Sequence, residues 1–407
     1  MKAPAIHWRG ALTRTLPHNI YKDNSVTTMN TDADLRIERV ETRLLDVPLF
    51  RPHGFATYTA TAQPILLVSV HLSGGVTGYG EGVVPGGPWW GGESAETMQV
   101  IVERYLAPVM VGRQVNELAG IMQDFEAVVA NMRFAKAACD VAMHDAWARA
   151  LDVPVRDLLG GRVRDEIDLT WALGVLPLEE AVAEITERME TMGTRSFKLK
   201  MGAGDPDRDT RRIASLAAEL RNSGKEVGLR VDVNARWDRL TALRYLPRLA
   251  DAGVELFEQP TPAHELDTLR ELTTRIGVPV MADESVCSPA DALAVVQAKA
   301  ADVVAIKTTK LGGLLESKKA AAIAGAAGLA CHGATSLEGP FGTAASLHFA
   351  CATPEITFGS ELFGPLLLKE SYTTEQLDYS DGVVRLPEGP GLGLEPDWDK
   401  IEHFTRQ

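Results

Sequence analysis

Cysteine is scarce in this sequence of 407 residues, and long hydrophobic runs are absent. The four cysteines lie far apart without a CxxC pair, which predicts neither a disulfide framework nor a thiolate zinc site but reduced, mostly buried thiols. No stretch approaches the ~20 apolar residues of a transmembrane helix, and the start has no positive segment followed by an apolar run. We therefore expect a cytoplasmic protein. The cysteines are Cys139, Cys287, Cys331 and Cys351.

The sequence also has no excess of positive charge: its formal net charge is −14 and its pI is near 5.2. Nucleic acids and anionic membranes are polyanions that such a field repels, so we expect neither as a partner. The sequence has no Gly-x-Ser-x-Gly elbow, phosphate loop or Ser-x-x-Lys motif, which gives little support to covalent acyl transfer or nucleotide chemistry. An anionic small-molecule substrate would need a local positive site.

The length predicts one large domain with a smaller companion. Residues 1–35 show no periodicity and contain a second methionine, Met29, so they are predicted to be a disordered extension or a misassigned start. Residues 36–160 predict an α+β capping domain, because alternating runs separated by turn signals indicate a small antiparallel sheet and residues 94–150 have helical spacing. The alternating runs are Ile37–Leu49, Pro64–Leu72 and Val76–Glu81.

From residue 161 to residue 360, short apolar runs alternate with helical stretches, which predicts an α/β fold with a parallel sheet. Successive runs end about 25 residues apart, the sum of one strand, one helix and two loops. An open doubly wound sheet could share this spacing, but eight units without GxGxxG after the first strand favour a closed (β/α)8-like barrel, a modified TIM barrel. Residues 361–407 leave the repeat and are expected to pack on the capping domain and complete it. The runs are Asp168–Gly174, Ser196–Gly202, Gly228–Asn234, Glu255–Pro260, Pro279–Ser285, Val303–Thr309, Gly328–Ala334 and Glu355–Ser360.

Ionisable residues stand at the ends of five consecutive runs, where the active sites of such barrels lie. Unpaired charges inside strands are costly, so this repetition indicates function. Asp232, Glu258 and Asp283 are predicted to converge on the barrel axis as hard oxygen ligands, which suit Mg²⁺ or Mn²⁺. For any one of them a helix cap or an ion pair with an exposed lysine is an equal alternative, but not for all three together. The full set is Lys198, Lys200, Asp232, Asn234, Glu258, Asp283, Glu284 and Lys307.

Lys198 and Lys200 point to the same face of one strand, because side chains alternate with a period of two, and Lys307 approaches from the far side of the barrel. We expect crowding and a nearby divalent cation to lower a lysine pKa toward the working pH, as a general acid or base requires. The alternative for an isolated Lys-x-Lys is a solvated edge strand. The glycine-rich segment 85–93, with its two tryptophans, fits a flexible lid or equally an ordinary surface loop.

Several short segments are specific in combination. They are Lys-Leu-Lys at 198–200, Val-Asp-Val-Asn at 231–234, Phe-Glu-Gln-Pro at 257–260, Ala-Asp-Glu-Ser at 282–285 and Ile-Lys at 306–307. With them, the sequence from about residue 37 to the C-terminus resembles the enolase superfamily, in its muconate-lactonising subgroup. Finer features resemble the muconate and chloromuconate cycloisomerases: Arg51-Pro52-His53, Ser336-Leu337-Glu338-Gly339 and Glu361-Leu362-Phe363-Gly364-Pro365-Leu366. Mandelate racemase relatives instead have a His–Asp pair where this sequence has Lys307.

The resemblance implies an isomerase that reversibly converts cis,cis-muconate to muconolactone through a metal-stabilised enolate, in catechol breakdown, and that assembles as a homo-octamer. It implies that Asp232, Glu258 and Asp283 bind Mn²⁺ or Mg²⁺. It also implies that Lys198 stabilises the enediolate, that Lys200 moves the α-proton, and that Lys307 supplies charge or a proton from the opposite face. Glu338 would lie near the substrate carboxylate. The residues expected to bind substrate are Asn234, His53, Tyr58 and Trp89.

Other functions remain open at this point. A chloromuconate cycloisomerase would differ mainly in pocket residues such as those near Trp89, Trp90 and Val175. An epimerase or racemase of amino-acid derivatives could use the same lysine pair to exchange an α-proton. A metal-free barrel aldolase with a Schiff-base lysine belongs to another class, and a non-catalytic binding protein is the least specific choice. The sequence leaves open which lysine is the acid, and hence syn or anti addition.

Overall fold

The computed structural model describes residues 35–54, 59–202 and 204–407. The predicted extension 1–35 therefore lies outside the described residues, apart from Leu35. Across the described ranges, no helix is both long and apolar enough to cross a membrane. The four cysteines are all free, and three of them are buried.

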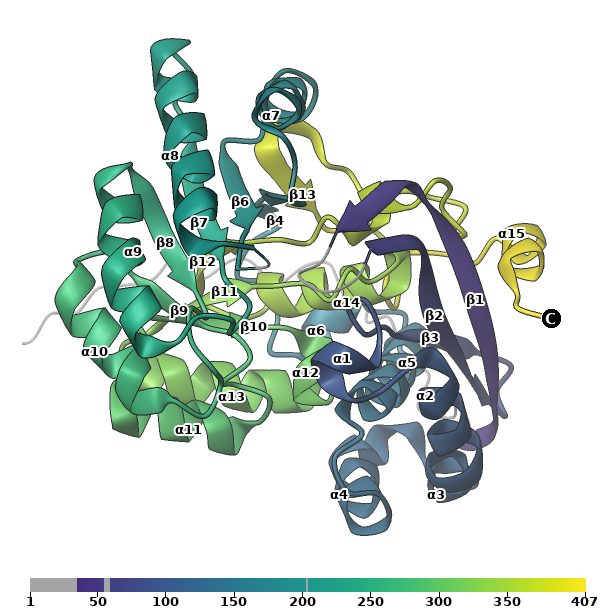
Figure 1. The fold of residues 1–407 in the computed structure, drawn as a ribbon. Helices are drawn as coiled ribbons and strands as arrows, with labels where there is room; N and C mark the ends of the chain where they lie inside the picture. The colour runs from purple at the N-terminus through teal and green to yellow at the C-terminus, as the bar shows by residue number, and fades with distance from the viewer. Residues whose placement is uncertain (1–34, 55–58, 203) are drawn as a thin grey trace, which may run out of the picture. The chain divides into compact units, whose positions relative to one another are not determined.

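The N-terminal part forms the predicted antiparallel sheet, with β1 (Ile37–Gly54), β2 (Thr59–Leu72) and β3 (Thr77–Gly82) in the order β1-β2-β3. Helix α5 (Arg133–Ala150) packs on this sheet (Figure 1). The helix lies so close that a Cβ at Gly78 would stand 2.1 Å from a backbone nitrogen of α5, and one at Gly80 would stand 2.1 Å from a backbone oxygen. Only glycine permits this approach. The other elements are α1 (Pro88–Gly91), α2 (Ala95–Ile101), η1 (Val102–Leu106), α3 (Ala107–Met110), η2 (Val115–Glu117), α4 (Leu118–Val128) and α6 (Val155–Leu158).

Eight parallel strands follow, in the order β12-β11-β10-β9-β8-β7-β6-β5, so the predicted barrel strands are confirmed. The ring is closed between its first and last strands by a bridge from Leu169 to Ser360, whose hydroxyl also donates to the carbonyl of Asp168 at 3.1 Å. The strands are β5 (Thr170–Leu173), β6 (Ser196–Lys200), β7 (Gly228–Asp232), β8 (Val254–Glu258), β9 (Val280–Ala282), β10 (Val303–Ile306), β11 (Ala330–Gly333) and β12 (Ile356–Ser360).

Helices surround this barrel because each strand is connected to the next by a helical segment (Figure 1). Amphipathic helices bury their apolar stripe against the strands, and two of them, α8 and α11, begin with a side-chain cap followed by proline. The helices are α7 (Leu178–Met192), α8 (Pro206–Asn222), α9 (Arg239–Asp251), α10 (Leu266–Ile276), α11 (Pro289–Ala298), α12 (Thr308–Leu311), α13 (Leu314–Ala326) and α14 (Pro340–Cys351).

The C-terminal segment contacts both parts of the molecule. Leu368 and Thr405 form bridges with Leu49 and Leu45 of β1, while β13 (Val383–Arg385) pairs with β4 (Glu166–Asp168) at the barrel. The boundaries 36–160, 161–360 and 361–407 stay a prediction. The remaining elements are η3 (Gly364–Leu367), η4 (Ser380–Gly382) and α15 (Trp398–Phe404).

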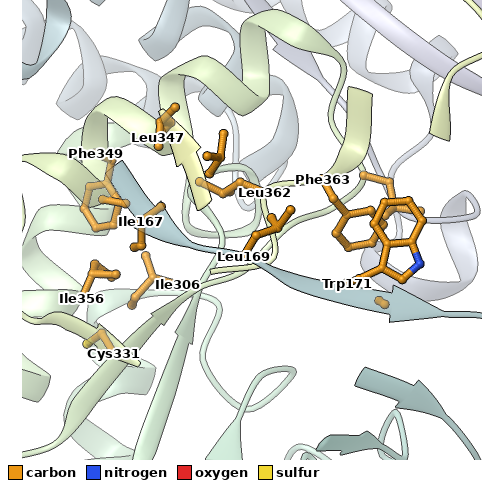
Figure 2. Packing of buried hydrophobic residues seen from close by; sticks show 14 of the residues in the cluster. Ile167, Leu169, Trp171, Ile306, Cys331, Leu347, Phe349, Ile356, Leu362 and Phe363 are labelled. Carbon is orange, nitrogen blue, oxygen red and sulfur yellow. The ribbon is translucent and has the colours of Figure 1, made fainter. Parts of the chain in front are cut away.

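A continuous hydrophobic core fixes the strand that begins the barrel against the segment that ends it. Figure 2 shows Trp171 of β5 beside Phe363, and their ring centroids are 5.0 Å apart. The indole of Trp171 donates to Glu184 of α7 at 2.8 Å, and Glu184 also accepts from Arg51 of β1 at 2.6 Å. The Arg51-Pro52-His53 segment therefore attaches the β1 end of the capping sheet to the barrel.

Candidate active site

The ionisable residues singled out in the sequence lie at one end of the barrel. Register brings them to one level, because Lys200 pairs with Asp232 between β6 and β7, and Asp232 pairs with Glu258 between β7 and β8. Asp283 follows β9 directly and Lys307 follows β10. Carboxyl ends of parallel barrel strands meet at one face, which explains why the spacing along the chain indicated a cluster.

Lys198 is held by three acids and is almost fully buried. Its Nζ donates to Glu258 Oε2 at 2.7 Å and to Glu361 Oε2 at 2.5 Å, and lies 3.7 Å from Asp232 Oδ2. Behind it, Glu361 lies 3.2 Å from Nε2 of buried His332. Sequence reasoning assigned no role to Glu361, although it directly follows β12 and so obeys the strand-end rule that found the others.

Lys200 and Lys307 approach from opposite strands. Lys200 Nζ donates to Asp232 and, at 3.3 Å, to Asn234 Oδ1. Lys307 Nζ donates to Asp283 Oδ2 at 2.6 Å. A fourth amine, Lys310, donates to the other Asp283 oxygen, also at 2.6 Å. Sequence reasoning missed Lys310, which lies one helical turn after Lys307 on the short helix α12.

The acids set the pKa of the lysines. Burial alone lowers the pKa of Lys198, but Glu258, Glu361 and Asp232 raise it more, so the pKa lies well above that of a free lysine. The pKa of Lys307 is raised in the same way, by Asp283 and Glu258. The described residues alone therefore raise the pKa of both lysines, because acids rather than amines surround each of them; the lowering expected beside a divalent cation stays a prediction.

Burial raises the pKa of Glu258 well above its usual range, and the charge of Asp232 raises it further. Burial also raises the pKa of Asp283, but Lys307 and Lys310 lower it more, so the net shift is downward. A cation between these acids would stabilise the charged form of each one.

The three acids fit a divalent metal ion in their chemistry. Over the described ranges, no three His, Cys, Asp or Glu side chains form a ready metal-binding group, and each of Asp232, Glu258 and Asp283 is instead paired with a lysine. All three carboxylates are fully buried, and Glu258 Oε1 has no hydrogen-bond partner in the described part of the chain. Hard oxygens with an unmet acceptor suit Mg²⁺ or Mn²⁺.

A cavity with an empty volume of about 470 Å³ lies over this cluster. Lys198, Lys200, Lys307, Asn234 and Trp89 all line it, as the sequence analysis expected of catalytic and substrate-binding residues. The other lining residues are Pro85, Trp90, Ala172, Thr335, Leu337, Glu361 and Phe363.

The other predicted site residues are placed differently. Glu338 is fully buried behind the cavity wall, where its carboxylate accepts from Thr335, from the Ser336 amide at 2.9 Å and from Thr309 at 3.2 Å. His53 belongs to β1, and Tyr58 lies outside the described residues. Glu338 does not line the cavity, the side chain of His53 is not described, and the roles of all three residues stay predictions.

The tryptophans of the glycine-rich segment cover the cluster from the capping side. Lys307 Nζ lies 4.6 Å from the ring centroid of Trp90, and Arg236 lies 5.9 Å from that of Trp89. On its other side Trp90 packs edge to face on Phe134 of α5, at 6.0 Å. The segment is thus anchored on both sides. Val175, named above among the residues expected to differ in a chloromuconate cycloisomerase, is exposed.

A capped barrel with lysines and acids at its strand ends is the layout of a barrel enzyme of the enolase type. Residues 39–160 match the family model of the mandelate racemase / muconate lactonizing enzyme N-terminal domain, and residues 180–400 match that of the enolase C-terminal domain-like proteins. The chain belongs to this family, in its muconate-lactonising subgroup. A divalent metal ion is the cofactor of this group.

Similar proteins with known activities cover nearly the whole chain. Muconate cycloisomerase 1 of Rhodococcus opacus is 62% identical over 92% of this chain and 99% of its own length. A chloromuconate cycloisomerase of Cupriavidus necator is 40% identical over 91% of this chain and 100% of its own. The crystal structure of a muconate lactonizing enzyme from Pseudomonas fluorescens complexed with muconolactone has a TM-score of 0.88 at 35% identity, covering 92% of this chain and all of its own.

Proposed function

We propose that the chain is a muconate cycloisomerase, which reversibly converts cis,cis-muconate to muconolactone in aromatic catabolism. The observation that carries this proposal is the placement of lysines on both sides of one small cavity, with Lys200 on β6 and Lys307 after β10. Similarity supports it, since a muconate cycloisomerase is 62% identical along almost the whole chain. The reaction needs cations near an anionic substrate, and this cavity supplies them in a protein of net charge −14.

The reaction forms one bond and transfers one proton. A carboxylate oxygen of the substrate adds to the conjugated diene, and the electron pair moves to the carbon beside the other carboxylate, where an enediolate develops. Lys198 holds positive charge near the enediolate, and the ammonium of Lys200 gives its proton to the α-carbon. Lys307 supplies charge from the opposite face, and would be the acid if addition had the other stereochemistry. Preorganised cations of this kind lower a barrier by several kcal/mol.

Asp232, Glu258 and Asp283 would hold the divalent ion, Mn²⁺ or Mg²⁺, which neutralises charge on the enediolate when bound. Their lysine partners, Lys198, Lys200 and Lys307, line the cavity and would face the substrate beside such an ion. Asn234 donates to Asp232 at 3.1 Å and to Glu284 at 3.2 Å, so it keeps one of these three acids in place, and it contacts substrate through the cavity. Glu338 acts through Thr335, and Trp89 with His53 and Tyr58 contacts the far end of the substrate.

The direct test is the decay of muconate absorbance with purified protein and Mn²⁺ or Mg²⁺. We expect turnover with metal and none after EDTA treatment, and Lys200→Met should lose at least 100-fold in kcat. Lys319, an exposed lysine on α13, provides the matched control Lys319→Met. Absence of decay in the wild-type protein would refute the function.

Chloromuconate cycloisomerase activity is the second candidate, because relatives with that name are 40% identical over nearly their full length. Rates on muconate and on its chlorinated analogues, measured side by side, separate the two. We also propose a homo-octamer, to be tested by light scattering, and a cytoplasmic location, which the four free cysteines support.

A further inference from the structure

Glu81 is a buried carboxylate at a junction of three chain segments. It lies in β3 with 1% of its surface exposed. Its Oε1 accepts hydrogen bonds from the amide of Phe341, at 3.0 Å, and from the hydroxyl of Tyr372, which is itself fully buried. No basic side chain in the described part of the chain forms an ion pair with it, and burial raises its pKa to about 7.

The second oxygen of Glu81 lies beside Gly342 of α14. Oε2 has no hydrogen-bond partner among the residues that the structure describes. A Cβ added at Gly342 would lie 2.9 Å from Glu81 Oε2 and 2.8 Å from Glu338 Cβ, so the two acids flank this glycine. A buried carboxylate without a cation is costly, so its hydrogen bonds to the Phe341 amide and the Tyr372 hydroxyl are what hold it there.

Glu81 caps a helix of the barrel from the capping domain. Helix α14 begins after Gly339, which has no side chain to accept from the free amides of the first turn. Glu81 supplies that acceptor across 260 residues of chain. A carboxylate at this end also interacts favourably with the helix dipole.

Two of the three chain segments that meet at Glu81 continue directly into the cavity wall. On the capping side, β3 ends one residue later and the chain continues to Pro85 and Trp90. On the barrel side, the loop before α14 carries Thr335 and Leu337. Glu81 therefore joins two parts of the cavity wall: the glycine-rich segment 85–93, called the lid segment below, and the loop before α14 with Thr335 and Leu337, called the barrel loop.

The barrel loop needs such a restraint because its backbone is strained. Leu337 has a φ of +62°, a conformation that costs a residue with a Cβ about 1–3 kcal/mol and persists only where the surroundings hold it. On its other side the loop touches Gly364, where a Cβ would lie 2.1 Å from the carbonyl oxygen of Glu338. Fixed contacts thus hold the loop from both directions.

We propose that Glu81, together with Tyr372, is a positioning residue that sets the distance between the lid segment and the loop of Thr335 and Leu337, and so determines how tightly substrate is bound. The substrate named below rests on the proposed function. Glu81 touches no reacting atom, so it acts through the two walls of the cavity and not in the proton transfer.

The test compares Glu81→Gln and Tyr372→Phe with a matched control, Asp145→Asn. Asp145 is also a fully buried acid that accepts amide hydrogen bonds from distant segments, from Tyr79 at 2.8 Å and Leu392 at 2.7 Å; unlike Glu81 it also pairs with Arg149 at 3.0 Å, and none of these partners lines the cavity. Glu81→Gln keeps the shape and one carbonyl oxygen, and Tyr372→Phe removes only the hydroxyl. All three variants should lower Tm.

Only the first two variants should change substrate binding. We expect KM for cis,cis-muconate to rise roughly three- to tenfold with kcat within twofold, the size expected for one lost hydrogen bond at a buried carboxylate. Hydrogen–deuterium exchange should rise about fivefold or more in peptides covering 335–342 and 83–91, whereas Asp145→Asn should raise it only around Tyr79 and Leu392.

Unchanged KM and unchanged exchange at 335–342 in both variants would overturn the inference, as would an equal rise of KM in Asp145→Asn. The exchange measurement needs no substrate. If the wild-type protein does not turn over muconate, the proposed function fails while the exchange comparison still decides the role of Glu81.

Discussion

Replacing Glu361 by glutamine tests whether the contact between this acid and Lys198 matters for the reaction. Glu361 is 2% exposed, and its carboxylate lies 2.5 Å from Lys198 Nζ. Glutamine keeps the shape but removes the negative charge, so the Lys198 ammonium loses its ion pair and keeps only an amide oxygen, a loss of about 1.5–3 kcal/mol. Since each 1.4 kcal/mol corresponds to a factor of ten, kcat/KM for muconate should fall roughly 10- to 100-fold.

A second variant locates the effect. His332 touches Glu361 at 3.2 Å and does not line the cavity, so His332→Asn should cost only about three- to tenfold. Because His332 acts through Glu361, the double variant should be no worse than Glu361→Gln alone. The assay is muconate absorbance at saturating Mn²⁺, with Tm measured for each protein. A value of kcat/KM within twofold of wild type for Glu361→Gln, or full additivity of the two changes, would refute this reasoning.

Three further predictions concern other residues. Lys310→Met leaves the buried Asp283 with one amine, so the free energy of unfolding in urea should fall by about 3 kcal/mol; a loss under 1 kcal/mol would contradict the pairing. Burial lowers the pKa of His348 to about 4, below the 6.5 of an exposed histidine, so the unfolded chain binds the extra proton and stability is lost as pH falls from 6.5 through 4. Relative to His348→Gln, the wild-type protein should lose roughly 3 kcal/mol across that window in urea titrations. Trp90→Ala should lower kcat/KM about fivefold through the lost contact with Lys307, whereas Trp90→Phe should keep most of the wild-type kcat/KM. The same loss of kcat/KM in both variants would exclude a role for the ring face.

The barrel could be predicted from the sequence because its strands are buried on both faces. Such strands appear as short apolar runs, and all eight predicted runs contain a strand in the structure. The same regularity located the site, since Asp232, Glu258 and Asp283 had only to stand at strand ends for the fold to gather them. Their roles as ligands stay a prediction.

Contacts that no periodicity encodes could not be predicted. The partner of Glu81 is Tyr372, 291 residues away, and nothing in either local sequence points to the other. The acids around Lys198 could not be predicted for a related reason: counting amines along β6 indicated crowding, whereas the pKa also depends on acids from other strands, Glu258 and Glu361 among them. Glu338 was assigned by its motif, and its side chain points into the wall because Thr335 and Thr309 satisfy it there.

The glycines of β3 have a consequence for redesign. Gly78 and Gly80 bring the strand into direct backbone contact with α5, so neither element can shift to absorb a change in its neighbour. A segment from another protein that replaces residues 83–93 would be attached to this fixed strand. Any difference in the shape of the new segment would then change the cavity and not the support. Replacing these residues should therefore alter substrate specificity directly.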